Sequence, residues 1–176
     1  MPDKRINRRV YQSYSRQILN IPGEYLEAVS IGHRVFSPIF QFENGLRLAM
    51  HKFMVTCYGT DWWELSLKLR LPDIYNYVET QKLKKSYMPW IGDSTRVPLL
   101  PIHLITLGQL EQIIIHYKSD CIPELFPTID FFTGHMEVIK RVRNLFSHMY
   151  PCITTHDVVV AKREIRTLCD HLKRKV

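Results

Sequence analysis

The feature that constrains the fold most is the spacing of apolar residues between Ile129 and Phe146. They recur at steps of three and four residues: Ile129, Phe132, Met136, Ile139, Val142 and Phe146. This spacing places them on one face of an α-helix. Similar spacing returns in several other segments, whereas strand-like alternation is scarce. The sequence therefore predicts an all-α fold.

A long helix is predicted from Pro38 to Cys57, followed by a turn and a second helix. The expected buried face of the first helix is Ile39, Phe42, Leu46, Ala49, Phe53 and Cys57. Gly59 suits a left-handed cap, and Asp61 with Glu64 three residues later indicates a helix start. The adjacent Trp62 and Trp63 are interpreted as a helix-junction core. Stacking of these rings on nucleic-acid bases is the alternative.

Three more segments complete the predicted helices. A polar helix runs from Ile74 to about Tyr87, and the proline-rich Met88–Ile102 is a loop that carries Arg96. Thr106 caps a helix through Tyr117, whose apolar face is Leu107, Leu110, Ile113, Ile114 and Tyr117. Pro123 and Pro127 bracket a short connection. The last helix begins at Asp157 and has Val158, Ala161, Ile165, Leu168 and Leu172 on one face.

Composition narrows the class of protein. The chain has 176 residues and a net charge of +7, with 24 Lys plus Arg against 17 Asp plus Glu, so an acidic partner such as nucleic acid is favoured. Four cysteines without metal-site spacing predict reduced, mostly buried thiols and no metal. Neither a membrane-spanning apolar run, nor a signal peptide, nor a phosphate-binding glycine loop is found. We expect a cytoplasmic, soluble protein without cofactors.

Residues 1–36 are predicted to form a basic N-terminal helix or arm, ahead of a helical domain at residues 37–176. The first 20 residues of the chain contain five Lys and Arg residues and one acidic residue. An apolar residue recurs every fourth position in this segment, at Ile6, Val10, Tyr14 and Ile18. The segment is therefore interpreted as an arm over RNA or over a second subunit, or as the solvated basic face of an ordinary first helix.

The candidate catalytic residues lie in the segment Glu137–Tyr150. Within it, Arg143, Asn144 and His148 combine a fixed cation, an orienting amide and a titratable imidazole, which suits a phosphodiester. At about 100° per residue, one polar stripe is formed by Glu137, Arg141, Asn144 and His148. Arg143 lies roughly 140° from His148 on a straight helix. Either the helix bends or ends near Ser147, or the two side chains reach one phosphate from different edges.

A structural interpretation of His148 stands beside the catalytic one. A histidine in the last turn before Pro151 is also explained by the helix dipole and by the need to cap free carbonyls. The motif alone does not separate these two interpretations, so its context in the chain decides between them.

The segment resembles the R-x4-H signature of the HEPN family, in the version with Asn after Arg. Two further strings, Tyr58-Gly59-x-x-Trp62-Trp63 and Thr106-x-Gly108-x-Leu110, resemble its abortive-infection branch. The matching pieces spread from about Phe42 to Leu172. The resemblance implies an HEPN-like helical bundle at residues 37–176, a two-fold dimer, and a metal-independent ribonuclease with Arg143, Asn144 and His148 as its catalytic residues.

Two further features are assigned through this resemblance. Glu43, Arg47 and His51 form a row at i,i+4 spacing. One interpretation is an ion pair with a surface histidine beside it. The other is that this row supports the site, as does Arg141: Glu43 would hold Arg143, or Arg47 would contact the RNA backbone. Arg143-x4-His148-x-Tyr150 resembles the version in HEPN toxins that are paired with a nucleotidyltransferase antitoxin. There Tyr150 would be the site of a regulatory adenylylation; alternatively it packs before Pro151.

The function expected from the sequence is therefore an endoribonuclease of the toxin or phage-defence type, cutting by 2′-hydroxyl attack at a composite dimer site. Its expected partners are an RNA substrate, a second copy of the chain, and an antitoxin or other defence-system protein. The alternative is a non-catalytic helical module that binds RNA or a partner such as the antitoxin. Duplex DNA binding is disfavoured because no helix-turn-helix signature is visible.

Overall fold

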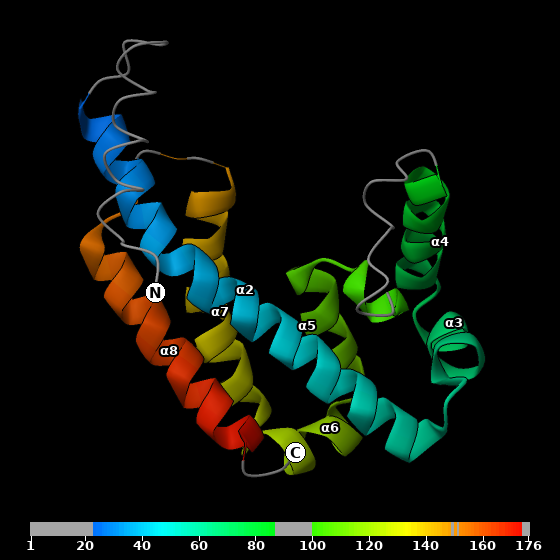
Figure 1. Cartoon of the computed structure of the whole chain (residues 1–176). Helices are drawn as coiled ribbons and strands as arrows, with labels where there is room; N and C mark the ends of the chain where they lie inside the picture. The colour runs from blue at the N-terminus through cyan, green and yellow to red at the C-terminus, as the bar shows by residue number, and fades with distance from the viewer. Residues whose placement is uncertain (1–22, 87–99, 149, 151, 174–176) are drawn as a thin grey trace, which may run out of the picture. The chain divides into compact units, whose positions relative to one another are not determined.

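The computed structural model describes residues 23–86, 100–148, 150 and 152–173, and within these the regular structure is helical without a strand (Figure 1). The elements are α2 (Gly23–Tyr58), the π-helix η1 (Trp63–Leu67), α3 (Lys68–Arg70), α4 (Pro72–Ser86), the 3-10 helix η3 (Pro101–His103), α5 (Leu107–His116), α6 (Lys118–Leu125), α7 (Ile129–Ser147) and α8 (Thr155–Lys173). The predicted all-α fold is confirmed for this part of the chain. The basic residues 1–20 and most of the predicted loop, including Arg96, lie outside it.

The chain divides into two compact units that share three helices. Of the described residues, unit 1 contains residues 23–40 and His135–Thr167, and unit 2 contains Gln41–Gly134 and residues 168–173. The helices α2, α7 and α8 therefore each contribute one part to each unit. The predicted boundary between residues 36 and 37 lies inside α2 and inside unit 1.

Helix α2 begins 15 residues before the predicted start at Pro38, so that prediction is wrong. Proline lacks an N–H group and clashes with the preceding turn, which usually ends a helix. Here Pro38 lies inside the helix, and Ile31, Val35 and Ile39 on both sides of it are buried. Burial of these side chains offsets the local cost of the proline. The predicted buried face is also corrected, because Met50 and Met54 are buried while Phe53 and Cys57 are not.

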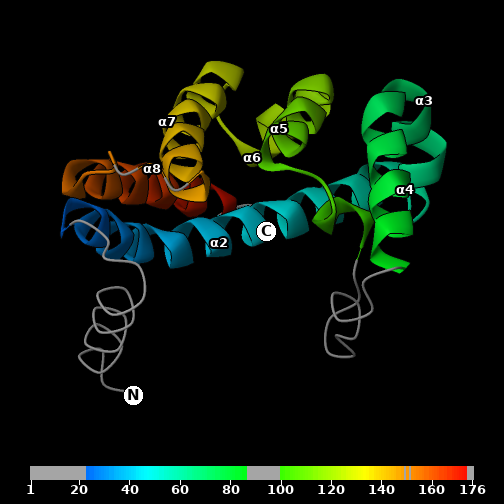
Figure 2. The ribbon, with the colours of Figure 1, turned by 90° about the horizontal axis from the view of Figure 1, so that it is seen from above.

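Unit 1 is built from the first half of α2, the second half of α7 and the first part of α8. Figures 1 and 2 show this part of α8 alongside α2, with α7 beside both. Most of the predicted apolar faces are confirmed, since Met136, Ile139, Val142, Val158, Ala161 and Ile165 are all buried. Thr154 and Asp157 begin α8 with a reciprocal cap. The Thr154 N–H donates to Asp157 Oδ2 at 2.9 Å, and the Asp157 N–H donates to Thr154 Oγ1 at 3.2 Å.

Unit 2 confirms the predicted turn at Gly59, whose φ of 83° lies in the left-handed region. Trp62 and Trp63 follow it and are 1% and 5% exposed, with ring centroids 5.1 Å apart in an edge-on arrangement. The helix-junction interpretation of this pair is therefore confirmed. Figure 2 shows α3 and α4 side by side in this unit.

The helix α5 is capped as predicted: the Gln109 N–H donates to Thr106 Oγ1 at 3.2 Å, and the Thr106 N–H donates to Gln109 Oε1 at 2.8 Å. Its whole predicted apolar face is buried. The connection expected between Pro123 and Pro127 is corrected, because Pro123 lies inside α6, which continues to Leu125. Cys121, Ile122 and Leu125 of this helix are buried, so packing extends the helix past the proline.

The structure also bears on the predictions for the cysteines and for membrane-spanning helices. The four cysteines are free as expected, but only Cys121 is buried, whereas Cys57 and Cys152 are exposed and Cys169 is intermediate. The expectation of mostly buried thiols is therefore wrong. Among the described helices, none combines the length and the apolar character that crossing a membrane requires.

Candidate functional site

The predicted motif lies at the C-terminal end of α7, in unit 1. The helix ends at Ser147, and His148 is the next residue. The His148 N–H donates to the carbonyl oxygen of Asn144 at 3.0 Å, and the Tyr150 N–H donates to that of Leu145 at 2.9 Å. These bonds close the last turn. The helix thus ends at Ser147, as one of the two predicted geometries has it.

The polar stripe expected on α7 faces solvent. Glu137, Arg141, Asn144 and His148 are all exposed. Arg143 is half-buried, and its Nη1 lies 3.5 Å from Asn144 Oδ1, which is a weak contact. The cation and the amide of the motif therefore lie against each other, and the imidazole stands in solvent just beyond the helix.

Tyr150 lies close to His148. The two ring centroids are 5.9 Å apart at an interplanar angle of 48°, and the tyrosine side chain is 53% exposed.

Arg141 extends the positive charge of this surface toward α8. Hydrogen bonds from Thr154 hold the pKa of Asp157 below its ordinary value of 3.8, against the opposing effect of burial, and the charge of Arg141 lowers it further. The effect on Asp157 places Arg141 within electrostatic range of the first turn of α8.

The row Glu43, Arg47 and His51 belongs to unit 2, where the predicted ion pair is confirmed. Arg47 Nη2 lies 3.2 Å from Glu43 Oε2 and donates to the carbonyl oxygen of Ile105 at 3.1 Å. The two side chains are 8% and 13% exposed, and Arg47 Nε is buried without a hydrogen-bond partner. In this conformation Arg47 holds α2 against the segment before α5. Its predicted contact with RNA would require its side chain to leave this position.

His51 is fixed by a neighbour that sequence reasoning did not connect to it. Trp62 Nε1 donates to His51 Nδ1 at 3.2 Å, so His51 carries its proton on Nε2. Burial lowers the pKa of His51 below its ordinary value of 6.5. The side chain is therefore a neutral hydrogen-bond donor near pH 7, rather than a cation for phosphate.

His103 is a second such histidine, and no sequence signal beyond the residue itself marked it. Its Nδ1 accepts the N–H of Leu100 at 3.1 Å. Its pKa is lowered by burial and by the nearby charges of Arg47 and His51.

Unit 1 holds another cluster that the sequence did not reveal. His135 Nδ1 is hydrogen-bonded to Glu164 Oε2, and Arg163 Nε donates to Glu164 Oε1 at 2.8 Å. Glu164 is 6% exposed. Burial raises its pKa, but the hydrogen bonds from Arg163 and His135 outweigh this and leave the pKa below its ordinary value of 4.5. A buried carboxylate with two such partners links α7 to α8.

Within the described residues, no group of three or more His, Cys, Asp or Glu side chains could hold a metal ion. The chain matches none of the protein-family models, curated proteins or solved structures with which it was compared.

Proposed function

We propose that the protein is a metal-independent endoribonuclease of the toxin or phage-defence type and a member of the HEPN family. The observation that carries the proposal is the end of α7, where the Arg143 guanidinium lies against the Asn144 amide and His148 stands exposed one residue beyond the helix. The net charge of +7 supports a polyanionic substrate.

RNA brings its own nucleophile to such a site. The 2′-hydroxyl attacks the adjacent phosphorus, and the bond to the 5′ oxygen of the next nucleotide breaks, leaving a 2′,3′-cyclic phosphate and a 5′-hydroxyl. A base must take the 2′ proton, an acid must supply one to the leaving oxygen, and positive charge must stabilise the crowded phosphate. We assign proton transfer to His148, phosphate binding to Arg143, and orientation of the phosphate or imidazole to Asn144.

One copy of the motif provides one imidazole, while strand scission uses both a base and an acid. A two-fold dimer that brings two motifs together would supply two imidazoles and two guanidinium groups in one cleft. We therefore place the site at the interface of a homodimer. Tyr150, exposed beside His148, is the position at which an antitoxin would switch the enzyme off by covalent modification.

The proposal is tested by incubating structured and unstructured RNA with the protein in EDTA. We expect cleavage to persist, and His148→Ala to lower the rate about 100-fold or more because general acid–base catalysis is lost. The matched control is His156→Ala, which removes another exposed histidine of unit 1. Arg143→Lys should also lose most activity, because a point charge does not reproduce a planar fork on phosphate.

The result that contradicts the proposal is equally specific. RNA that is bound but not cut by the wild-type protein would identify the alternative, a non-catalytic helical module that binds RNA or a partner protein. A His148→Ala variant that keeps its helical circular-dichroism signal and its full cleavage rate would instead remove His148 from the mechanism. If the site is composite, adding an excess of the His148→Ala chain should inhibit cleavage by the wild-type chain. Activity that stays proportional to the amount of wild-type chain would indicate a complete site in each copy.

A further inference from the structure

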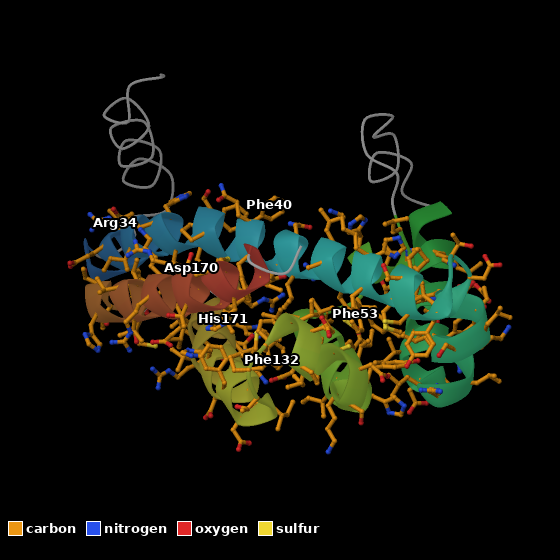
Figure 3. The ribbon with its side chains drawn as sticks, turned by 90° about the horizontal axis from the view of Figure 1, so that it is seen from below. Arg34, Phe40, Phe53, Phe132, Asp170 and His171 are labelled. Carbon is orange, nitrogen blue, oxygen red and sulfur yellow. The ribbon has the colours of Figure 1, made fainter. Side chains whose placement is uncertain are left out.

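The exposed side of α8 in unit 1 carries positive charge. In residues 155–167, all of which the structure describes, the exposed Lys, Arg, Asp and Glu side chains are those of Lys162, Arg163 and Arg166. At about 100° per residue they fall within an arc of roughly 100° on the helix surface. We call these three residues the α8 basic face. The next exposed acidic residue along α8 is Asp170, labelled in Figure 3, in the part of the helix that belongs to unit 2.

The two acidic residues in this part of α8 are occupied by contacts within unit 1. Glu164 is buried and is hydrogen-bonded to His135 and Arg163. Asp157 is half-buried and accepts the N–H of Thr154 at 2.9 Å. Their carboxylates therefore hold structure together inside the unit, and of the α8 basic face only Arg163 is neutralised by one of them.

The stability of α8 does not explain the positions of Lys162 and Arg166. The two lie four residues apart, and like charges at this spacing repel each other and slightly destabilise a helix. In the described part of the chain neither side chain belongs to an ion pair. Both also lie before the last turn of α8, which ends at Lys173, whereas the helix dipole favours cations only within that turn. Two repelling cations with no internal role indicate a partner of opposite charge.

The composition of this surface suits a phosphate backbone better than a protein or a membrane. A protein interface is centred on large apolar or aromatic side chains, but Val159 is the one exposed apolar side chain in residues 155–167. A helix that lies on a membrane inserts its apolar face, yet that face of α8, with Val158, Ala161 and Ile165, is buried in the protein. Four residues of helix span about 6 Å, which is comparable to the separation of neighbouring phosphate groups in a strand.

We infer that the α8 basic face binds the sugar–phosphate backbone of RNA without reading its sequence. Cationic side chains that are not accompanied by aromatic or amide groups contact phosphates rather than base edges. The face follows the motif closely in the chain, since α7 ends at Ser147 and α8 begins at Thr155. It would therefore lengthen the contact of a strand that reaches the motif. That the bound strand is also cut rests on the proposed function; the binding itself does not.

The inference is tested by fluorescence anisotropy with the full chain and a labelled 2′-O-methyl RNA, which keeps the phosphates but lacks the nucleophile. The double variant Lys162→Gln with Arg166→Gln should raise Kd about tenfold or more and flatten the slope of log Kd against log salt by about 1.4, because two phosphate contacts are lost. Arg166→Lys should stay within about twofold of wild type, since a point charge is sufficient for backbone binding. The matched control is Lys84→Gln with Lys118→Gln, which removes two exposed lysines of unit 2 and the same net charge.

Circular dichroism establishes that each variant keeps its helices. A wild-type Kd in the Lys162 and Arg166 double variant would overturn the inference, and so would an equal loss in the control, which would indicate an effect of net charge alone. Wild-type protein that binds vesicles of phosphatidylserine and phosphatidylcholine but not the oligonucleotide would overturn it in favour of a membrane surface. Affinities that differ strongly between RNA sequences would contradict backbone binding.

Cleavage of unmodified RNA by the same variants separates this inference from the proposed function. Binding that obeys the expected pattern, in a wild-type protein that cuts no RNA, would contradict the proposed function alone. Cleavage that depends on His148, in a protein whose affinity does not depend on Lys162 and Arg166, would overturn the inference alone.

Discussion

The two units use their aromatic side chains in opposite ways. In unit 2, Trp62, Trp63 and Tyr117 are each at most 5% exposed. Arg70 lies over the Tyr117 ring at 5.3 Å, and the Tyr117 hydroxyl is hydrogen-bonded to Ser66 Oγ at 3.0 Å. In unit 1, by contrast, Phe36 and Phe40 are about half exposed.

The buried Trp and Tyr rings of unit 2 also carry polar atoms, which Phe36 and Phe40 of unit 1 lack. A buried Trp or Tyr usually places its N–H or O–H group against a partner, which fixes the neighbouring elements around it, although the buried Trp63 Nε1 has no hydrogen-bond partner. Trp62 does so through His51, and Tyr117 through Ser66. Phenylalanine has no such group, so Phe36 and Phe40 can be covered by any apolar surface of suitable shape. Unit 2 therefore uses these rings for internal stability, whereas two rings of unit 1 stay about half exposed.

Truncating one ring in each unit should show the largest difference in unfolding free energy between the two units. Trp62→Ala should lower the free energy of unfolding by about 3–5 kcal/mol, because it leaves a cavity and removes the donor to His51. Phe40→Ala should change it by no more than about 0.5 kcal/mol at concentrations where the chain is monomeric. Urea denaturation followed by circular dichroism measures both values. Equal losses in the two variants would show that Phe40 is a core residue after all.

A smaller effect is expected from the helix caps, one in each unit. Thr154→Ala removes the acceptor for the Asp157 N–H at the start of α8, and Thr106→Ala removes that for the Gln109 N–H at the start of α5. Each should cost about 1 kcal/mol of unfolding free energy. The corresponding serine variants keep the oxygen and should recover most of the loss. Alanine variants that unfold like wild type would mean that water replaces these caps without cost.

The smallest expected effects are on the pH dependence of stability, which should differ between the two units. The folded pKa values of His51 and His103 lie below their ordinary 6.5, so the unfolded chain binds more protons there. Their contribution to stability is therefore full above about pH 7 and is lost as pH falls. The pKa of Asp157 in unit 1 is also lowered, from 3.8, so its contribution is lost only at more acidic pH.

These two pH ranges are distinguished by two substitutions. His103→Asn keeps an acceptor for the Leu100 N–H but cannot be protonated, and it should flatten the stability curve between about pH 7 and pH 5. Asp157→Asn should leave that region unchanged and flatten the curve near pH 4 and below. Unfolding midpoints in urea, measured across this pH series, provide the test. A His103→Asn variant with the wild-type slope would remove His103 as a source of the acid sensitivity.

Much of the local structure could be predicted from the sequence because its causes lie within a few residues. Helical periodicity predicted the buried faces of α5 and α8 and most of the buried face of α7. The left-handed turn at Gly59 and the cap at Thr106 each depend on a single residue type at one position. The motif could be placed at the end of a helix for the same reason, since its spacing and the following Pro151 are visible in the chain.

What only the tertiary structure decided are the features in which distant segments meet. Arg47 and the carbonyl group of Ile105 are 58 positions apart, and His135 and Glu164 are 29 apart. Neither pair has a spacing that a local rule could detect. The continuation of α2 through Pro38 has the same origin, because a proline is unfavourable locally and is tolerated only where burial of its neighbours compensates. Short-range stereochemistry and periodicity therefore determined the helices, whereas the packing of those helices decided which charges are buried and which rings stay exposed.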